Sequence, residues 1–254
     1  MTMQDSMNRP DLNTWMSESI RLTCYPLTSP QVGEANYWNQ LFGEPPESRT
    51  HRIRESIQQD EGIIDNSKLI LGIQPMRIDW ILSHPEVLGQ FWIGRFLDSL
   101  TPFFDLMLRW LTICPPIKRL AFGTVLVMPV DNREAGYSLL GRYLSHVQLD
   151  AENSSDFLYQ INRTRMSRTR IEGLTINRLS KWSVAKMGTF HVEISPNTPL
   201  AISNPTSELF ACRLELDINT SQTYQNELPH DQLNNIFQEL VDLSRELALE
   251  GDIP

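Results

Sequence analysis

Cysteine is scarce in this sequence. Its 254 residues include only Cys24, Cys114 and Cys212, which lie far apart and are odd in number. They form no Cys-x-x-Cys pair, so the pattern supports neither a disulfide framework nor a thiolate metal site. The N-terminus also lacks the basic start and apolar run of a secretory signal. We therefore expect a protein of a reducing cytoplasm.

Familiar catalytic motifs are missing as well. The five histidines are scattered, without the His-x-x-x-His spacing of a zinc site on a helix. The sequence contains no Gly-x-Ser-x-Gly turn for a nucleophile and no Gly-x-x-x-x-Gly-Lys loop for phosphate. These absences favour a non-enzymatic binding or adaptor protein, and they lead us to expect no cofactor.

Long uncharged hydrophobic runs are absent too. The most apolar stretch, 87–114, is interrupted by Arg95, Asp98, Asp105 and Arg109. Because a membrane span needs about twenty nearly uncharged residues, this stretch predicts a core helix and no membrane contact. If one of its aromatic faces stayed exposed, that face would mark a protein partner or a homo-oligomer contact.

The chain is rich in alternating and amphipathic patterns. Period-two alternation predicts strands, at 18–27, 49–58, 68–82 (one strand or two), 118–128, 156–163, 174–184, 189–194 and 208–219. In the 49–58 strand, Ile53 and Ile57 are expected to point inward. Helical spacing predicts three helices, at 86–112, 132–147 and 231–250, the first with a kink or a new start at Pro102.

The order of these elements predicts the fold class. Neighbouring strands joined as hairpins favour an antiparallel sheet with helices on one face. We therefore predict an α+β fold in which a large antiparallel sheet is backed by about three helices. It forms one domain over residues 17–254, preceded by a disordered segment at 1–16.

Three short stretches carry a resemblance. "RIDW" (77–80) precedes a helical block, "FLYQINR" (157–163) forms a strand, and "LELDINT" (214–220) precedes the terminal helix. In this order of elements the chain resembles an uncharacterised family of bacterial proteins of similar length. The resemblance implies a bacterial cytoplasmic protein and supplies no catalytic residue.

Positive charge is concentrated in one segment of an acidic chain. The formal net charge is −9, yet only Glu172 opposes the basic residues between Arg163 and Lys186. The strands at 156–163 and 174–184 form a hairpin, from whose tip Arg163, Arg165, Arg168 and Arg170 are expected to project. We predict a surface for an acidic protein or a nucleic-acid backbone, formed by these four arginines with Arg178 and Lys181. The alternative is that the arginines pair with the chain's own carboxylates or lie in solvent.

A second candidate site lies on the two strands before the terminal helix. His191 and Glu193 share one side of the 189–194 strand, and Glu215 and Asp217 share one side of the 208–219 strand. If these strands pair, the four side chains form a site for a divalent cation. That arrangement would suit a metal-dependent hydrolase acting on nucleic acid or nucleotides. Simple alternation in half-exposed strands explains the same pattern.

Overall fold

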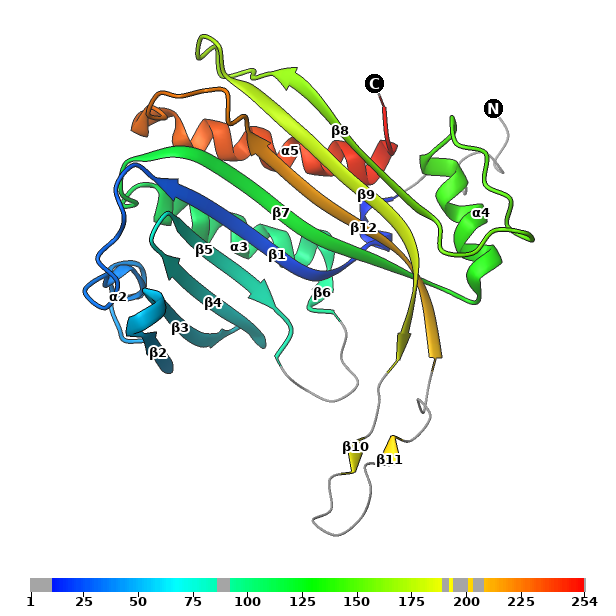
Figure 1. The fold of residues 1–254 in the computed structure, drawn as a ribbon, viewed down its shortest axis with the longest axis horizontal. Helices are drawn as coiled ribbons and strands as arrows, with labels where there is room; N and C mark the ends of the chain where they lie inside the picture. Colours follow the sequence, from blue (N-terminus) through cyan, green and yellow to red (C-terminus); the bar gives the residue numbers. More distant parts are fainter. Residues whose placement is uncertain (1–10, 86–91, 189–191, 194–200, 203–207, 254) are drawn as a thin grey trace.

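The computed structural model describes residues 11–85, 92–188, 192–193, 201–202 and 208–253. Within them, one antiparallel sheet has the strand order β2-β3-β4-β5-β1-β7-β12-β9-β8, and β6 pairs with the end of β1 (Figure 1). Its strands are β1 Met16–Pro26, β2 Ser48–Arg52, β3 Ile57–Ile64, β4 Ser67–Gln74, β5 Arg77–Ser83, β6 Gly94–Arg95, β7 Ile117–Val130, β8 Leu158–Met166, β9 Thr175–Gly188 and β12 Glu208–Thr220. The predicted α+β class with a large antiparallel sheet is confirmed.

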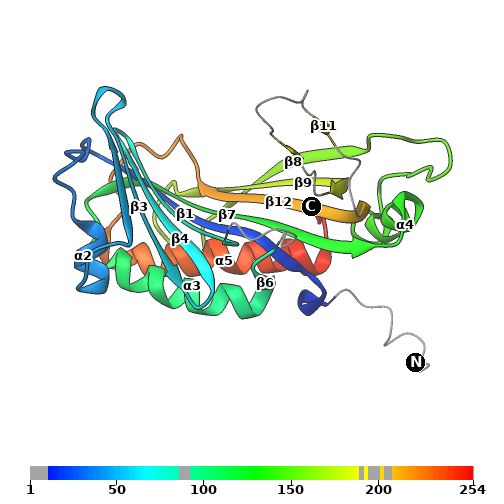
Figure 2. The same ribbon diagram turned by 90° about the horizontal axis from the view of Figure 1, so that it is seen from below.

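Four α-helices accompany the sheet in the described part of the chain. They are α2 Tyr37–Phe42, α3 Phe96–Leu111, α4 Arg133–Tyr143 and α5 Leu233–Glu250, and short 3-10 turns occur at η1 Leu12–Thr14, η2 Ile53–Glu55 and η3 His230–Gln232. Figure 2 shows α3 and α5 lying along the same face of the sheet. None of the described helices is long and apolar enough to cross a membrane.

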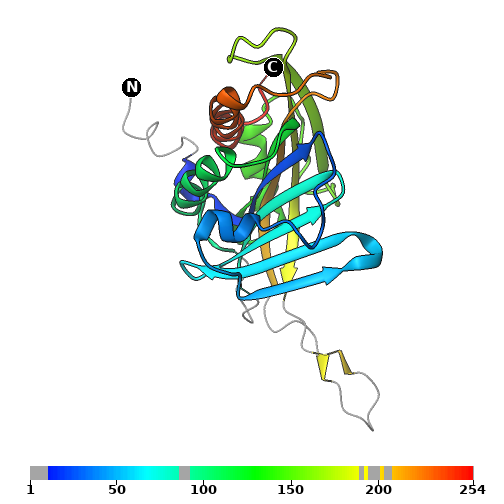
Figure 3. The same ribbon diagram turned by 90° about the vertical axis from the view of Figure 1, so that its left-hand side faces the viewer.

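The core lies between the sheet and these helices. Alternate residues of β1, namely Ile20, Leu22 and Cys24, point to the helices and are fully buried. α3 and α5 contribute their apolar stripes, including Trp110 and Phe237. The intervening residues of the strands point to the opposite face, over which no described helix lies (Figures 2 and 3). We call this second surface the helix-free face.

The N-terminal boundary and the first long helix differ from the sequence prediction. Residues 1–10 lie outside the described residues, but Trp15 is fully buried and its indole N–H donates to the carbonyl oxygen of Ala248. Order therefore begins before residue 17. α3 begins at Phe96 because Gly94 and Arg95 pair with β1, and it continues through Pro102 without a break. The predicted helical residues 86–91 lie outside the described part.

Two predicted strands are also corrected. The 49–58 run is interrupted by η2, since Ser56 adopts a left-handed conformation (φ 52°) that turns β2 back along β3. Ile53 lies in this turn and is 78% exposed rather than inward. Of the 189–194 strand, only Val192–Glu193 is described, as β10, and it pairs with β11 (Ala201–Ile202) in a separate small sheet.

Candidate functional site

The arginine-rich hairpin is formed by β8 and β9, but most of its basic residues do not project from the tip. Arg163 and Arg178 are direct cross-strand neighbours, and Arg165 follows two residues along β8. All three side chains point to the helix side of the sheet, because their neighbours Ile176, Ser180 and Trp182 on that side are buried. The prediction that Arg163 and Arg165 lie at the tip is therefore wrong.

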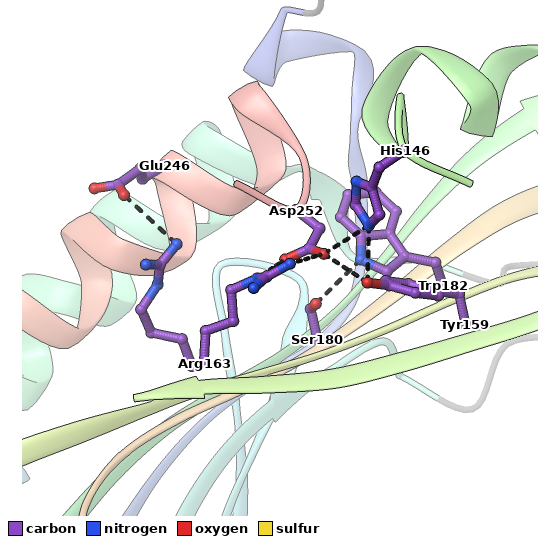
Figure 4. A network of polar contacts seen from close by, with 8 residues as sticks. His146, Tyr159, Arg163, Ser180, Trp182, Glu246 and Asp252 are labelled. Atoms are coloured by element: carbon purple, nitrogen blue, oxygen red, sulfur yellow. Dashed lines mark hydrogen bonds and ion pairs between the residues drawn. The ribbon is translucent and has the colours of Figure 1, made fainter. Parts of the chain in front are cut away.

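Arg163 is held by the carboxylate of Asp252, just beyond the end of α5. Asp252 is 4% exposed. It accepts hydrogen bonds from Nε and Nη2 of Arg163 at 2.6 and 2.9 Å and from the hydroxyl of Tyr159 at 2.6 Å (Figure 4). His146 Nε2 lies 3.2 Å from the same carboxylate. Burial alone would raise the pKa of Asp252, but these donors outweigh it, and the pKa lies below its ordinary value. This network, which we call the Asp252 latch, joins the C-terminus to β8.

A second carboxylate, Glu246 on α5, forms ion pairs with three other arginines of the hairpin. Its oxygens lie 3.4 Å from Arg165, 3.5 Å from Arg168 and 3.6 Å from Arg178. Arg178 is only 5% exposed, and burial lowers its pKa while Glu246 opposes that shift. The alternative interpretation, pairing with the chain's own carboxylates, therefore holds for Arg163, Arg165, Arg168 and Arg178.

The tip of the hairpin carries Arg168 and Arg170, and both are exposed. The tip is fixed by Glu239 of α5, which is 5% exposed. Glu239 accepts a hydrogen bond from the backbone N–H of Arg168 at 2.7 Å and one from the Ser167 hydroxyl at 2.6 Å. Arg170 has a left-handed backbone (φ 62°) and makes no ion pair with any described residue. A groove of about 390 Å³ separates Arg168 and Arg170 from the polar side of α5.

Lys181 belongs to a different surface. It lies on the helix-free face, where its ammonium group is 2.9 Å from Glu215 of the neighbouring strand β12. Arg213 also donates to Glu215. Lys181 therefore does not join the arginines in one patch, because consecutive residues of a strand point to opposite faces.

The predicted carboxylate cluster is not formed as the sequence suggested. Its premise was that the 189–194 strand pairs with β12, but β12 pairs with β7 and β9. Glu193 lies on β10 in the small separate sheet, and His191 lies outside the described residues. Within the described ranges, no three His, Cys, Asp or Glu side chains are placed to hold a metal ion. Glu215 and Asp217 do share the helix-free face.

The three cysteines are buried free thiols. Burial raises the pKa of Cys114 and of Cys212 to about 12, and it raises that of Cys24 as well. Because a nucleophilic cysteine needs a lowered pKa and access to substrate, these thiols are suited to the core rather than to reaction.

Sequence reasoning missed the acidic partners on and after α5 and one arginine of β1. Glu239, Glu246 and Asp252 contact residues about 70 to 90 positions away, which no local pattern reveals. Arg21 lies at an outward position of β1, opposite Gly123 of β7. Gly123 interrupts an apolar run of β7. A glycine in a strand is the one local signal that another group lies close to the backbone at that point.

In comparisons with known proteins, no protein family, no curated protein and no solved structure matches this chain.

Proposed function

We propose that this chain is a non-enzymatic binding protein of a bacterial cytoplasmic complex, and that it contacts an acidic segment of a partner protein. The contact surface is the arginine tip, defined as Arg168, Thr169 and Arg170 together with the facing residues of α5, Asn235, Gln238 and Asp242. The observation that carries the proposal is Arg170, an exposed arginine beside the backbone that Glu239 holds, without an ion pair to any described carboxylate.

The backbone at the tip supports this proposal. A non-glycine residue in the left-handed region costs about 1–3 kcal/mol, and such strain is typical of functional positions. Here the tip is held by Glu239, whose carboxylate is occupied by Ser167 and by the backbone of Arg168. The loop is therefore preorganised, which reduces the entropy lost when Arg170 binds a partner.

The surroundings favour a protein over a nucleic acid. The net charge is −9, and Asp242 lines the groove beside the arginines. A phosphate backbone would be repelled by these carboxylates along its length, whereas an acidic peptide can place one side chain on Arg170. The amides of Asn235 and Gln238 offer donors and acceptors suited to peptide groups.

The test compares two double variants with the same charge change. Arg168→Ser/Arg170→Ser removes the arginine tip. Arg52→Ser/Arg54→Ser removes two exposed arginines beside and within η2. Arg52 pairs with Glu55, as Arg168 pairs with Glu246, and Arg54, like Arg170, has no ion pair to a described residue. A fluorescent Glu-rich peptide and a single-stranded oligonucleotide are titrated onto each variant over a range of salt concentrations.

We expect the peptide to bind the wild-type protein and the η2 variant equally, and the tip variant at least about tenfold more weakly. Equal binding by all three proteins, or no binding to the wild type, would refute the proposal. Oligonucleotide binding with a steep salt dependence and loss at the tip would instead identify a nucleic-acid partner. Thermal unfolding should differ little among the three proteins, since exposed ion pairs contribute about 0–1 kcal/mol.

A further inference from the structure

A groove of about 490 Å³ lies at the centre of the helix-free face. Side chains from six strands, β5, β1, β7, β12, β9 and β8, line it. Its apolar walls include Ile81, Val125 and Leu179, and its charged groups are Arg21, Lys181, Glu215 and Asp217. Pockets of this size, with apolar walls and a few charged groups, are typical of small-molecule sites.

Three residues at the same register position of neighbouring strands form the floor of the groove. Arg21 of β1, Gly123 of β7 and Asp217 of β12 are direct neighbours across three strands. A Cβ atom at Gly123 would lie 3.2 Å from Nη2 of Arg21 and 3.4 Å from its Nε. The guanidinium therefore lies over the bare backbone of Gly123, and the glycine makes room for it.

Arg21 has no partner among the residues that the structure describes. Its Nε is buried without a hydrogen bond, and no described carboxylate lies within ion-pair distance of the guanidinium. A partly buried guanidinium without a counter-charge is unfavourable, because its lost hydration is not replaced. The guanidinium of Arg21 is therefore suited to bind an anionic ligand that enters the groove from solvent.

Asp217 faces Arg21 from the other side of Gly123 and likewise makes no ion pair with the described part of the chain. It accepts a hydrogen bond from the side-chain amide of Asn219 at 3.0 Å. Glu215 and Lys181, by contrast, neutralise each other at 2.9 Å. The groove thus presents one cation and one anion, each without an ion pair to any described residue, at the same register position two strands apart.

We infer that this groove binds a small zwitterion, a free amino acid with an apolar side chain. Its carboxylate meets the guanidinium of Arg21 in a bidentate pair, and its ammonium group donates to Asp217. The side chain packs on the apolar walls provided by Ile81, Val125 and Leu179. This site is on the opposite face of the sheet from the Asp252 latch, and it does not depend on the partner contact proposed for the arginine tip.

The test uses L-leucine and two analogues that each lack one charge. 4-Methylpentanoate lacks the ammonium group, and 3-methylbutylamine lacks the carboxylate. Binding is measured by calorimetry and by the Nε–Hε resonance of Arg21 in NMR spectra. The variants are Arg21→Met, which removes the cation, and Gly123→Ala, which displaces the guanidinium at unchanged charge. Arg54→Met, at an exposed arginine with no ion pair to a described residue, is the control.

We expect L-leucine to shift the Arg21 resonance and to bind at least about tenfold more tightly than either analogue. Arg21→Met and Gly123→Ala should each weaken binding at least about tenfold, while Arg54→Met should leave it unchanged. In the absence of leucine, Arg21→Met should melt no lower than the wild type, because it removes an unpaired charge. Failure of leucine to bind at about 10 mM, equal binding of the analogues, or unchanged binding by Arg21→Met would each overturn the inference.

Discussion

The Asp252 latch predicts that a single charge near the C-terminus controls stability. The change Asp252→Asn keeps the size of the side chain but removes its negative charge. In the wild-type protein this carboxylate accepts hydrogen bonds from Arg163 and Tyr159 and lies close to His146. The variant therefore leaves the guanidinium of Arg163 beside a neutral amide.

The magnitude follows from the burial of the two partners. Breaking a buried ion pair by removing one partner costs about 3–5 kcal/mol. The side chain of Asp252 is 1% exposed, but that of Arg163 is 28% exposed and can regain some hydration. The amide also still accepts a hydrogen bond. We therefore expect a loss of about 2 kcal/mol in the free energy of unfolding, or about 4–8 °C in melting temperature for a chain of this size.

Urea denaturation at pH 7 measures this loss, with Asp105→Asn as the control. Asp105 is exposed on α3 and makes no ion pair with a described residue, so its substitution should change stability by less than about 0.5 kcal/mol. Since the pKa of Asp252 is lowered by folding, its stabilisation is complete above the unfolded pKa of about 3.9 and is lost as the pH falls through the lower folded value. The difference between wild type and Asp252→Asn should therefore be constant from pH 5 to 7 and shrink only below about pH 4.

Two results would refute this reasoning. Equal stability of Asp252→Asn and Asp105→Asn at pH 7 would mean that the latch contributes nothing to folding. A difference that grew as the pH fell below about 4 would mean that the carboxylate is protonated more easily in the folded state than in the unfolded chain.

Three further predictions concern other parts of the fold. Gly251→Ala should destabilise by more than about 2 kcal/mol in urea denaturation, because φ is 82° and the new Cβ would lie 2.0 Å from the carbonyl oxygen of Tyr143. The control Gly141→Ala, with nothing within 4 Å, should instead stabilise α4 by about 0.5–1 kcal/mol. Glu239→Gln should speed hydrogen exchange of residues 167–174 without a matching change in β12, because Glu239 bonds Ser167 and the backbone of Arg168. An equal change in both segments would show that Glu239 does not hold the tip. The buried thiols should resist iodoacetamide at pH 8 until the chain unfolds, and rapid labelling of the native protein would contradict their burial.

Much of the fold could be predicted from local patterns. The alternation over 174–184 correctly predicts the strand β9, and the three-and-four spacing over 231–250 correctly predicts the helix α5. These predictions succeed because side-chain direction repeats every two residues in a strand and about every 3.6 in a helix. The interruption at Ile53 was missed because one residue, Ser56, adopts a left-handed turn that alternation does not reveal.

The grouping of the arginines was visible in the sequence, but their partners were not. By itself the sequence determined that Arg163, Arg165 and Arg178 belong to one basic hairpin in an acidic chain, but it placed Arg163 and Arg165 at the tip. Only the tertiary structure decided that these side chains face α5 and meet Glu246 and Asp252. It likewise placed Arg21 over Gly123, where no described carboxylate pairs with it. The reason is that charge pairing depends on distances set by packing between elements far apart in the chain, whereas a sequence pattern records only the direction of a side chain within its own element.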